Sequence, residues 1–169
     1  MRFILFFLPF LFIGCGYKNS YYYQQKILST KISPKVNISI QNPKESIFLK
    51  DALIDAIYTV FRGEIKKDAK TKIEVNLNGF SLDAIDYDKN SYPILYRSKV
   101  YLRVKLIDKY KKVHFYTING SYDFAIQSNT VINETTKLEA FKIASINALN
   151  QLLVEITKDG VNYDNKRGS

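Results

Sequence analysis

The sequence predicts an α/β fold, a two-layer α+β sandwich in which two helices cover one face of a four-stranded mixed sheet. Several segments alternate apolar and polar residues, as half-buried strands do, whereas two longer segments repeat apolar residues at helical spacing. The segments follow one another in the order β-α-β-β-β-α. With 169 residues, the chain is long enough for one domain with a sizeable core. The second face of such a sheet would be polar and exposed.

The first strand and the first helix are expected before residue 63. Apolar and polar residues alternate strictly over residues 35–40, which predicts a strand. A helix follows over residues 43–62, because Asn42 can cap it and Pro43 suits its first turn. Gly63 is a natural place for this helix to stop. The strand before the helix and the strand after it should be parallel, joined by a right-handed crossover.

Three further strands are expected to form an antiparallel meander. They cover residues 71–88, 94–109 and 113–127. In the first of these strands the apolar residues change face past Asn78 and Gly79. Because a one-residue slip would turn the apolar set to solvent, this change predicts a β-bulge. A polar, lysine-rich hairpin tip joins the last two strands.

The second helix is expected over residues 136–158. Its apolar residues recur at helical spacing, and Thr136 followed by Glu139 has the spacing of a capping box. Gly160 and the polar residues after it are expected to close the chain as a frayed tail.

The N-terminal segment has the pattern of an export signal. Arg2 precedes an apolar run, residues 3–13, which is too short to span a bilayer, since a spanning helix needs about 20 residues. Gly14 then precedes Cys15, the one cysteine of the sequence. Phe12-Ile13-Gly14-Cys15 resembles the lipobox of bacterial lipoproteins, although leucine is more usual at the position of Phe12. The resemblance implies cleavage before Cys15 and acylation of that residue; the alternative is an ordinary signal peptide followed by a chance cysteine.

These features together predict how the chain is divided. We expect a lipoprotein signal peptide (1–14), a lipidated N-terminal tether (15–34), a single α/β sandwich domain (35–158) and a flexible C-terminal tail (159–169). The tether contains three consecutive tyrosines, Tyr21–Tyr23. Tyrosines suit a membrane interface, and they suit packing on the domain edge equally well.

The charge balance restricts the class of partner. The sequence has 25 lysines and arginines against 16 aspartates and glutamates, a formal net charge of +9. In an exported protein this favours anionic lipid, a polyanionic glycolipid or an acidic partner, and it argues against nucleic acid.

No residue pattern predicts catalysis. The sequence has one histidine and one cysteine, so we expect no metal site, and no nucleophile and base are arranged for hydrolysis. We expect no cofactor other than covalent acyl chains on Cys15, and no enzymatic activity. His114 has no obvious partner, and we expect a structural role for it.

Four basic residues of the strand expected over residues 94–109 share one face. Alternate side chains of a strand point the same way and lie about 6.6–6.8 Å apart along it, so a row of cations can follow a row of phosphates or carboxylates. We call these residues the basic ladder and predict that they bind an anionic ligand: Arg97, Lys99, Arg103 and Lys105. The alternative is that carboxylates of neighbouring strands neutralise them, with Glu74, Asp83 and Asp123 as the candidates.

The chain as a whole resembles a known family. Cys15-Gly16-Tyr17 at the start of a mature lipoprotein of this size is similar to the lipopolysaccharide-assembly outer-membrane lipoproteins, the LptE (RlpB) family. Residues 42–52, 95–100 and 120–124 look like a divergent branch of that family. The resemblance covers most of residues 15–158 and includes the order of strands and helices.

The resemblance implies a role in the outer membrane. A protein of this family sits in the lumen of an outer-membrane β-barrel, partly plugs it, supports its assembly and helps to place lipopolysaccharide in the outer leaflet. Its expected partners are the β-barrel lipopolysaccharide-assembly protein, lipopolysaccharide, and the membrane through the lipid anchor on Cys15. Its expected location is the periplasmic side of the outer membrane or the barrel lumen. A periplasm-facing lipoprotein that binds an anionic ligand or envelope polymer without a barrel partner is the second hypothesis.

Overall fold

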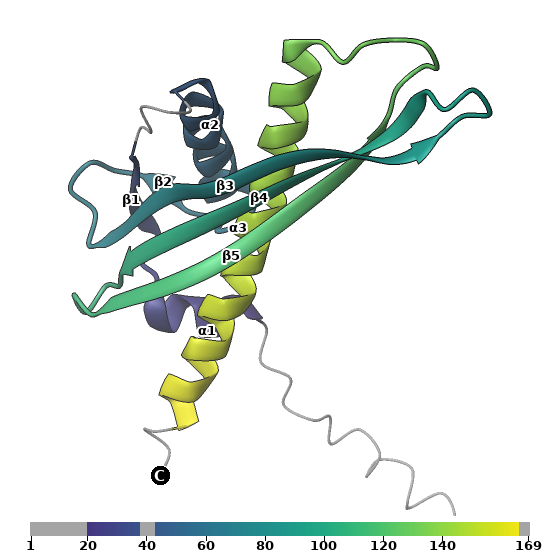
Figure 1. The fold of residues 1–169 in the computed structure, drawn as a ribbon. Coiled ribbons are helices and arrows are strands. Elements are labelled where there is room, and N and C mark those ends of the chain that lie inside the picture. Colours follow the sequence, from purple (N-terminus) through teal and green to yellow (C-terminus); the bar gives the residue numbers. More distant parts are fainter. Residues whose placement is uncertain (1–19, 38–42, 166–169) are drawn as a thin grey trace, which may run out of the picture.

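The computed structural model describes residues 20–37 and 43–165 (Figure 1). The elements in chain order are α1 (Ser20–Ile27), β1 (Lys31–Val36), α2 (Pro43–Thr59), β2 (Glu64–Ile65), β3 (Thr71–Tyr87), β4 (Pro93–Ile107), β5 (Val113–Ala125) and α3 (Glu134–Asn165). Within these described residues, no helix combines the length and the apolar character that crossing a bilayer requires. The expected signal peptide and Cys15 lie outside the described residues.

The strands form one mixed sheet in the order β2-β1-β3-β4-β5. β1 is parallel to β2 and β3, whereas β3, β4 and β5 are antiparallel neighbours. The α/β fold and the parallel strand–helix–strand unit expected from the sequence are therefore confirmed. The sheet has a fifth strand, β2, which the sequence did not predict because two residues are too few to show alternation.

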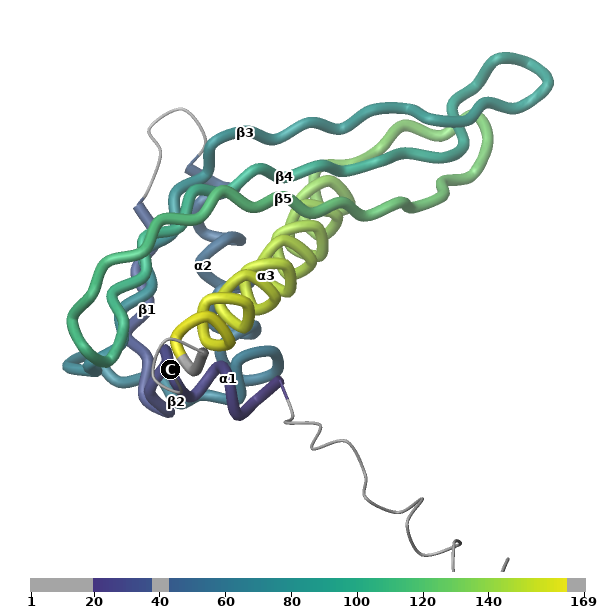
Figure 2. The backbone as a smooth tube through the Cα atoms, turned by 90° about the horizontal axis from the view of Figure 1, so that it is seen from below, coloured from purple at the N-terminus to yellow at the C-terminus, as the bar shows by residue number. Residues whose placement is uncertain are grey.

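All three helices lie on one side of the sheet (Figure 2). α2 packs against β1, α3 packs against β5 and β4, and α1 packs against α3. The core between the layers is apolar, and its largest fully buried side chains come from both layers: Phe141, Ile32, Leu49, Leu53, Ile57, Ile73, Leu102, Leu106, Ile118, Leu149, Leu152 and Ile156. No helix of the described residues lies over the opposite face of the sheet.

The first strand begins earlier than expected. β1 starts at Lys31 rather than at residue 35, and residues 38–40 of the expected strand lie outside the described residues. Pro34, expected at the end of the tether, pairs with Ile73 of β3. β2 pairs with β1 only at Lys31 and Ile32, so Pro34 lies beyond that pairing and its missing N–H costs no bond to β2.

Part of the segment expected to be a tether is helical and packed. α1 buries Gln24 and Ile27, and Leu28 after it is also buried. The three tyrosines Tyr21–Tyr23 lie in this helix. The helix that contains these tyrosines therefore packs on the domain, which is one of the two alternatives considered for them.

α2 begins where the sequence predicts but ends earlier than expected. The helix begins at Pro43, as expected, but ends at Thr59. The backbone turns left-handed at Arg62, with φ 50°, rather than at Gly63. The Gly63 amide then donates to the carbonyl of Ile57 over 2.8 Å, which closes the helix end with a residue other than glycine in the left-handed position.

The bulge in the long strand is confirmed. The register between β3 and β4 shifts between Leu77 and Gly79, where the apolar residues change face. Two more shifts follow at Ala84/Asp86 and Asp86/Tyr87. The far half of β3 and β4 projects beyond the helices as an arm (Figure 1).

α3 is longer than the helix expected over residues 136–158. It begins at Glu134 because Asn133, not Thr136, is the cap: the Asn133 Oδ1 accepts from the Thr136 amide over 2.8 Å. It continues to Asn165, so residues 159–165, expected in a tail, are helical. Gly160 lies inside the helix, where the backbone of α1 crosses close to it: a Cβ on Gly160 would lie 2.2 Å from the Tyr23 carbonyl oxygen.

Candidate functional site

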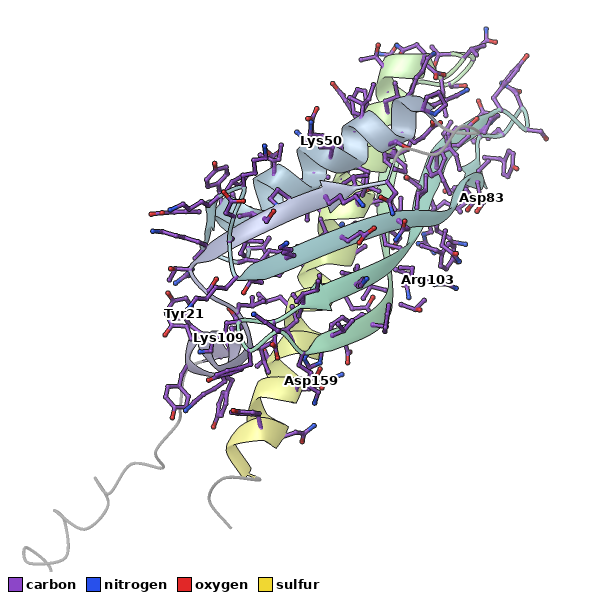
Figure 3. All side chains as sticks on the ribbon, turned by 90° about the vertical axis from the view of Figure 1, so that its left-hand side faces the viewer. Tyr21, Lys50, Asp83, Arg103, Lys109 and Asp159 are labelled. Atoms are coloured by element: carbon purple, nitrogen blue, oxygen red, sulfur yellow. The ribbon has the colours of Figure 1, made fainter. Side chains whose placement is uncertain are left out.

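The uncovered face of the sheet presents the basic ladder, of which Figure 3 labels Arg103. The alternation along β4 buries Val100, Leu102, Val104 and Leu106 under the helices, and this turns the ladder to the other side. Cations outnumber carboxylates on this face, which we call the open face. Its charged side chains include Lys31, Lys35, Glu64, Lys72, Glu74, Asp83, Arg97, Lys99, Arg103, Lys105 and Asp123.

The end of the ladder near the arm is neutralised by carboxylates. Arg97 faces Asp123 of β5 and donates to it twice, from Nε over 2.7 Å and from Nη2 over 2.6 Å. The hydrogen bond from Arg97 lowers the pKa of Asp123, and the same bond raises the pKa of Arg97. Lys99 Nζ lies 3.7 Å from Asp83 Oδ2. For these two cations the structure brings together the pairs that the sequence offered as the alternative to ligand binding.

The other half of the ladder has different neighbours. Arg103 lies between Asn76 of β3 and Thr117 of β5, which are both uncharged. Lys105 lies between Glu74 and Phe115. Neither cation forms a salt bridge with any residue that the structure describes, in contrast to Arg97 and Lys99.

Lys105 is part of a basic hollow on the open face. Lys35 of β1, Lys72 of β3 and Lys105 of β4 line a hollow of about 200 Å³, together with Ser33 and Glu74. Glu74 Oε1 lies 3.3 Å from Lys35 Nζ and accepts a hydrogen bond from Asn37 Nδ2 over 2.8 Å. The bond from Asn37 is the main cause of the lowered pKa of Glu74, with Lys35 contributing next. The hollow therefore contains one carboxylate and three lysines, so it has an excess of positive charge.

The sequence did not single out Lys35 and Lys72. Both lie on strands at positions opposite to the buried residues, so the alternating pattern contains the signal for which face they occupy. That they meet Lys105 depends on the strand order β1-β3-β4. The parallel strand β1 brings Lys35 level with Glu74.

His114 has partners that the sequence did not reveal. Its Nε2 lies 3.1 Å from Asp108 Oδ2, and its Nδ1 lies 3.7 Å from Asp159 Oδ2 of α3. The Tyr116 hydroxyl donates to the same Asp159 carboxylate over 2.6 Å. Burial, reinforced by this carboxylate, raises the pKa of Tyr116. The cluster ties the end of α3 to the sheet, and a structural role for His114 agrees with this geometry.

An apolar hollow lies on the helical side of the sheet. It encloses about 740 Å³ between the arm, the start of α3 and the loop before it, with Phe80, Leu82, Tyr96 and Leu138 in its wall. This hollow and the basic ladder are on opposite faces of the sheet. Its lining is mainly apolar and also includes the charged residues Glu45, Glu134 and Lys137.

The sequence and the fold were compared with those of known proteins. No protein-family model matches the sequence, and no curated protein matches it either. Solved structures of bacterial lipoproteins resemble the fold. They include rare lipoprotein B from Shewanella oneidensis (12% identity, 79% of this chain and 98% of that chain, TM-score 0.49) and a lipoprotein B from Nitrosomonas europaea (12%, 89% and 97%, TM-score 0.49). A minor lipoprotein from Acinetobacter baumannii is similar over 78% of this chain and 94% of that chain (11% identity, TM-score 0.42). At these values the similarity assigns neither a family nor a function.

Proposed function

We propose that this chain is an outer-membrane lipoprotein subunit of the lipopolysaccharide translocon. In this role it plugs a β-barrel partner, assists the assembly of that barrel and binds lipopolysaccharide during insertion into the outer leaflet. Acyl chains on Cys15 hold it at the membrane, and it catalyses no reaction. The lipobox-like Phe12-Ile13-Gly14-Cys15 and the resemblance of the sequence to the LptE family support this proposal.

The observation that carries the proposal is the half of the basic ladder that forms no salt bridge with any residue that the structure describes. Arg103 and Lys105 lie side by side on an uncovered sheet face, and Lys72 and Lys35 lie on the strands beyond them. Phosphate groups accept charge-assisted hydrogen bonds from such cations, and arginine engages them in bidentate fashion. Lipopolysaccharide carries phosphates, so the open face suits it.

Binding of lipopolysaccharide by two matched double variants tests the ligand. Arg103→Gln with Lys105→Gln should lower affinity for lipopolysaccharide about tenfold, the order expected when charge-assisted hydrogen bonds are lost. Arg97→Gln with Lys99→Gln removes the same charge, but from cations that already have carboxylate partners, and should change affinity less. Equal losses in the two variants, or no loss in either at low salt, would argue against the open face as the binding surface.

Purification of the native protein from mild detergent tests the partner. The proposal expects a large outer-membrane β-barrel protein to co-purify, and mass spectrometry to find acyl chains on Cys15. Recovery of an acylated protein without a barrel would favour the second hypothesis, an envelope lipoprotein that binds an anionic ligand or polymer by itself. An unmodified Cys15 would contradict both.

A further inference from the structure

Two hairpin turns at opposite ends of the sheet have the same construction. In the β4–β5 turn, Asp108 Oδ1 accepts from the amides of Tyr110 and Lys112, each over 2.8 Å. In the β3–β4 turn, Asp88 Oδ1 accepts from the amides of Asn90 and Tyr92, over 2.8 and 2.9 Å. The backbone is left-handed at the equivalent positions Lys111 (φ 69°) and Ser91 (φ 63°). The two turns therefore share a backbone geometry and differ in their side chains.

The turns present different side chains. The β3–β4 turn has the sequence Asp88-Lys-Asn-Ser-Tyr92, with one lysine, whereas the β4–β5 turn has Asp108-Lys-Tyr-Lys-Lys112, with three. In the second turn Lys111 and Lys112 are exposed, and Tyr110 is 52% exposed. Since the shared turn geometry does not require the extra lysines, their presence calls for another explanation.

The lysine-rich turn is attached to α1. The Lys109 amide donates to the Ile27 carbonyl over 3.1 Å, and the Lys109 ammonium donates to the Gln25 carbonyl. Tyr110 stacks on Tyr163 of α3, with ring centroids 5.8 Å apart. Figures 1 and 2 show α1, the β4–β5 turn and the end of α3 at one end of the molecule, with the β3–β4 turn at the other. α1 itself adds Tyr22, 39% exposed, and Lys26, whose ammonium lies 4.6 Å from the Tyr22 ring centroid.

The length of chain before α1 determines which end is near the membrane. Only residues 16–19 separate Cys15 from Ser20, the first residue of α1. A chain of that length reaches at most about 18 Å when fully extended. Acyl chains on Cys15 therefore hold the α1 end close to the headgroup layer. The β3–β4 turn lies at the other end of the molecule (Figure 1).

We propose that the α1 end of the domain docks on an anionic bilayer surface through a lysine–tyrosine surface, made of Tyr22, Lys26, Tyr110, Lys111 and Lys112. Lysines near a membrane are attracted by anionic headgroups, and tyrosine rings favour the boundary between headgroups and hydrocarbon. This inference rests on the proposed acylation of Cys15, and it is independent of lipopolysaccharide binding by the open face. It assigns the lipid-anchored domain an orientation on the bilayer before the domain enters a barrel partner, with the arm directed away from the surface.

Fluorescent labels at the two matched turns test the orientation. Because Cys15 is the one cysteine and its sulfur is occupied in the acylated protein, Lys111→Cys supplies a single free thiol, and so does Ser91→Cys combined with Lys111→Gln. Both labelled proteins then lack the Lys111 charge, so only the place of the label differs between them. The acylated full-length mature protein is reconstituted in vesicles of phosphatidylglycerol and phosphatidylethanolamine that contain a headgroup-level quencher. We expect strong quenching at position 111 and little at position 91, with the quenching at 111 lost in high salt or in phosphatidylcholine vesicles. Adding Lys112→Gln should reduce the docked population about fivefold, the effect of one lysine at an anionic surface.

Each result separates this inference from the proposed function. Equal quenching at positions 111 and 91 in acylated protein, or quenching that ignores salt and lipid charge, would overturn the lysine–tyrosine surface and leave the proposed function untouched. An unmodified Cys15 in the mass spectrum would overturn the anchor and this inference with it. Loss of lipopolysaccharide binding in the Arg103→Gln and Lys105→Gln variant would leave the expected quenching at positions 111 and 91 unchanged.

Discussion

At the scale of single residues, glycines have roles that only packing reveals. A Cβ on Gly120 of β5 would lie 2.3 Å from the Ala144 carbonyl oxygen and 2.3 Å from the Ala148 nitrogen of α3. A Cβ on Gly160 would likewise lie 2.2 Å from the Tyr23 carbonyl oxygen of α1. The sequence placed Gly160 in a frayed tail, after a helix expected to end at residue 158. Its actual role is to let two backbones approach each other.

Gly160→Ala should therefore destabilise the protein. Its Cβ has no room beside the Tyr23 carbonyl, so α1 must shift from α3, and we expect a loss of about 1–3 kcal/mol in the free energy of unfolding. Urea unfolding measures the effect. Gly79→Ala is the matched control, because its Cβ would meet Tyr101 Cδ2 at an ordinary 3.5 Å. Equal stability of the two variants would contradict the close crossing of α1 and α3.

The Arg97–Asp123 pair predicts a pH dependence. Because Arg97 lowers the pKa of Asp123 below its ordinary value of 3.8, the pair stabilises the folded protein above that value and loses its effect as the pH falls through the lowered pKa. Arg97→Gln should return the pKa of Asp123 towards 3.8 and make unfolding stability less sensitive to acid. A carboxyl titration by NMR, with unfolding curves at neutral and acidic pH, measures both effects. An unchanged Asp123 pKa in the variant would show that the pair does not form in solution.

At the scale of elements, the edge strand β5 shows how the fold protects an open hydrogen-bonding edge. The Asn119 amide donates to Gln151 Oε1 of α3 over 3.0 Å, and Asn147 Nδ2 donates to the Ser121 carbonyl over 2.8 Å. Side-chain amides of a helix thus occupy edge groups that could otherwise pair with another chain. Alternation predicted β5 itself, but not which helix residues would cover its edge.

Replacing both covering residues should loosen this edge. Asn147→Ala with Gln151→Ala removes the partners of β5, and we expect faster hydrogen exchange at the Asn119 amide and a stability loss of about 1 kcal/mol for each bond. Asn150→Ala, an exposed position on the same helix, is the control and should leave exchange at Asn119 unchanged. Exchange at Asn119 that is identical in all three proteins would show that the helix does not cover the edge.

At the scale of the whole molecule, two separate regions with clustered positive charge have different proposed ligands. The open face holds Arg103 and Lys105, and the lysine–tyrosine surface holds Lys111 and Lys112 beyond the ends of β4 and β5. Figure 3 labels Arg103 on the sheet and Lys109 at the α1 end, apart from each other. A single net charge in the sequence therefore corresponds to two regions with different proposed ligands.

The two regions should act independently. Arg103→Gln with Lys105→Gln should weaken lipopolysaccharide binding and leave headgroup quenching at position 111 unchanged. Lys112→Gln should do the reverse, since effects at separated sites usually add. Binding and quenching measured on both variants and on their combination check this expectation. A variant that changed both readouts would indicate one continuous anionic surface.

The sequence by itself determined the type and order of the main strands and helices, because the repeat of apolar residues is a local property of each segment. It also determined which strand positions face away from the core, and hence that the basic ladder shares one side of β4. Only the tertiary structure decided which of its cations are neutralised. Asp123 reaches Arg97 through the register of β5 against β4, while Arg103 meets Asn76 and Thr117 instead. Register and strand order arise from the packing of the whole chain. The same holds for the strand β2, the packed helix α1 and the extension of α3, because the residues of these three segments carry no comparable local pattern.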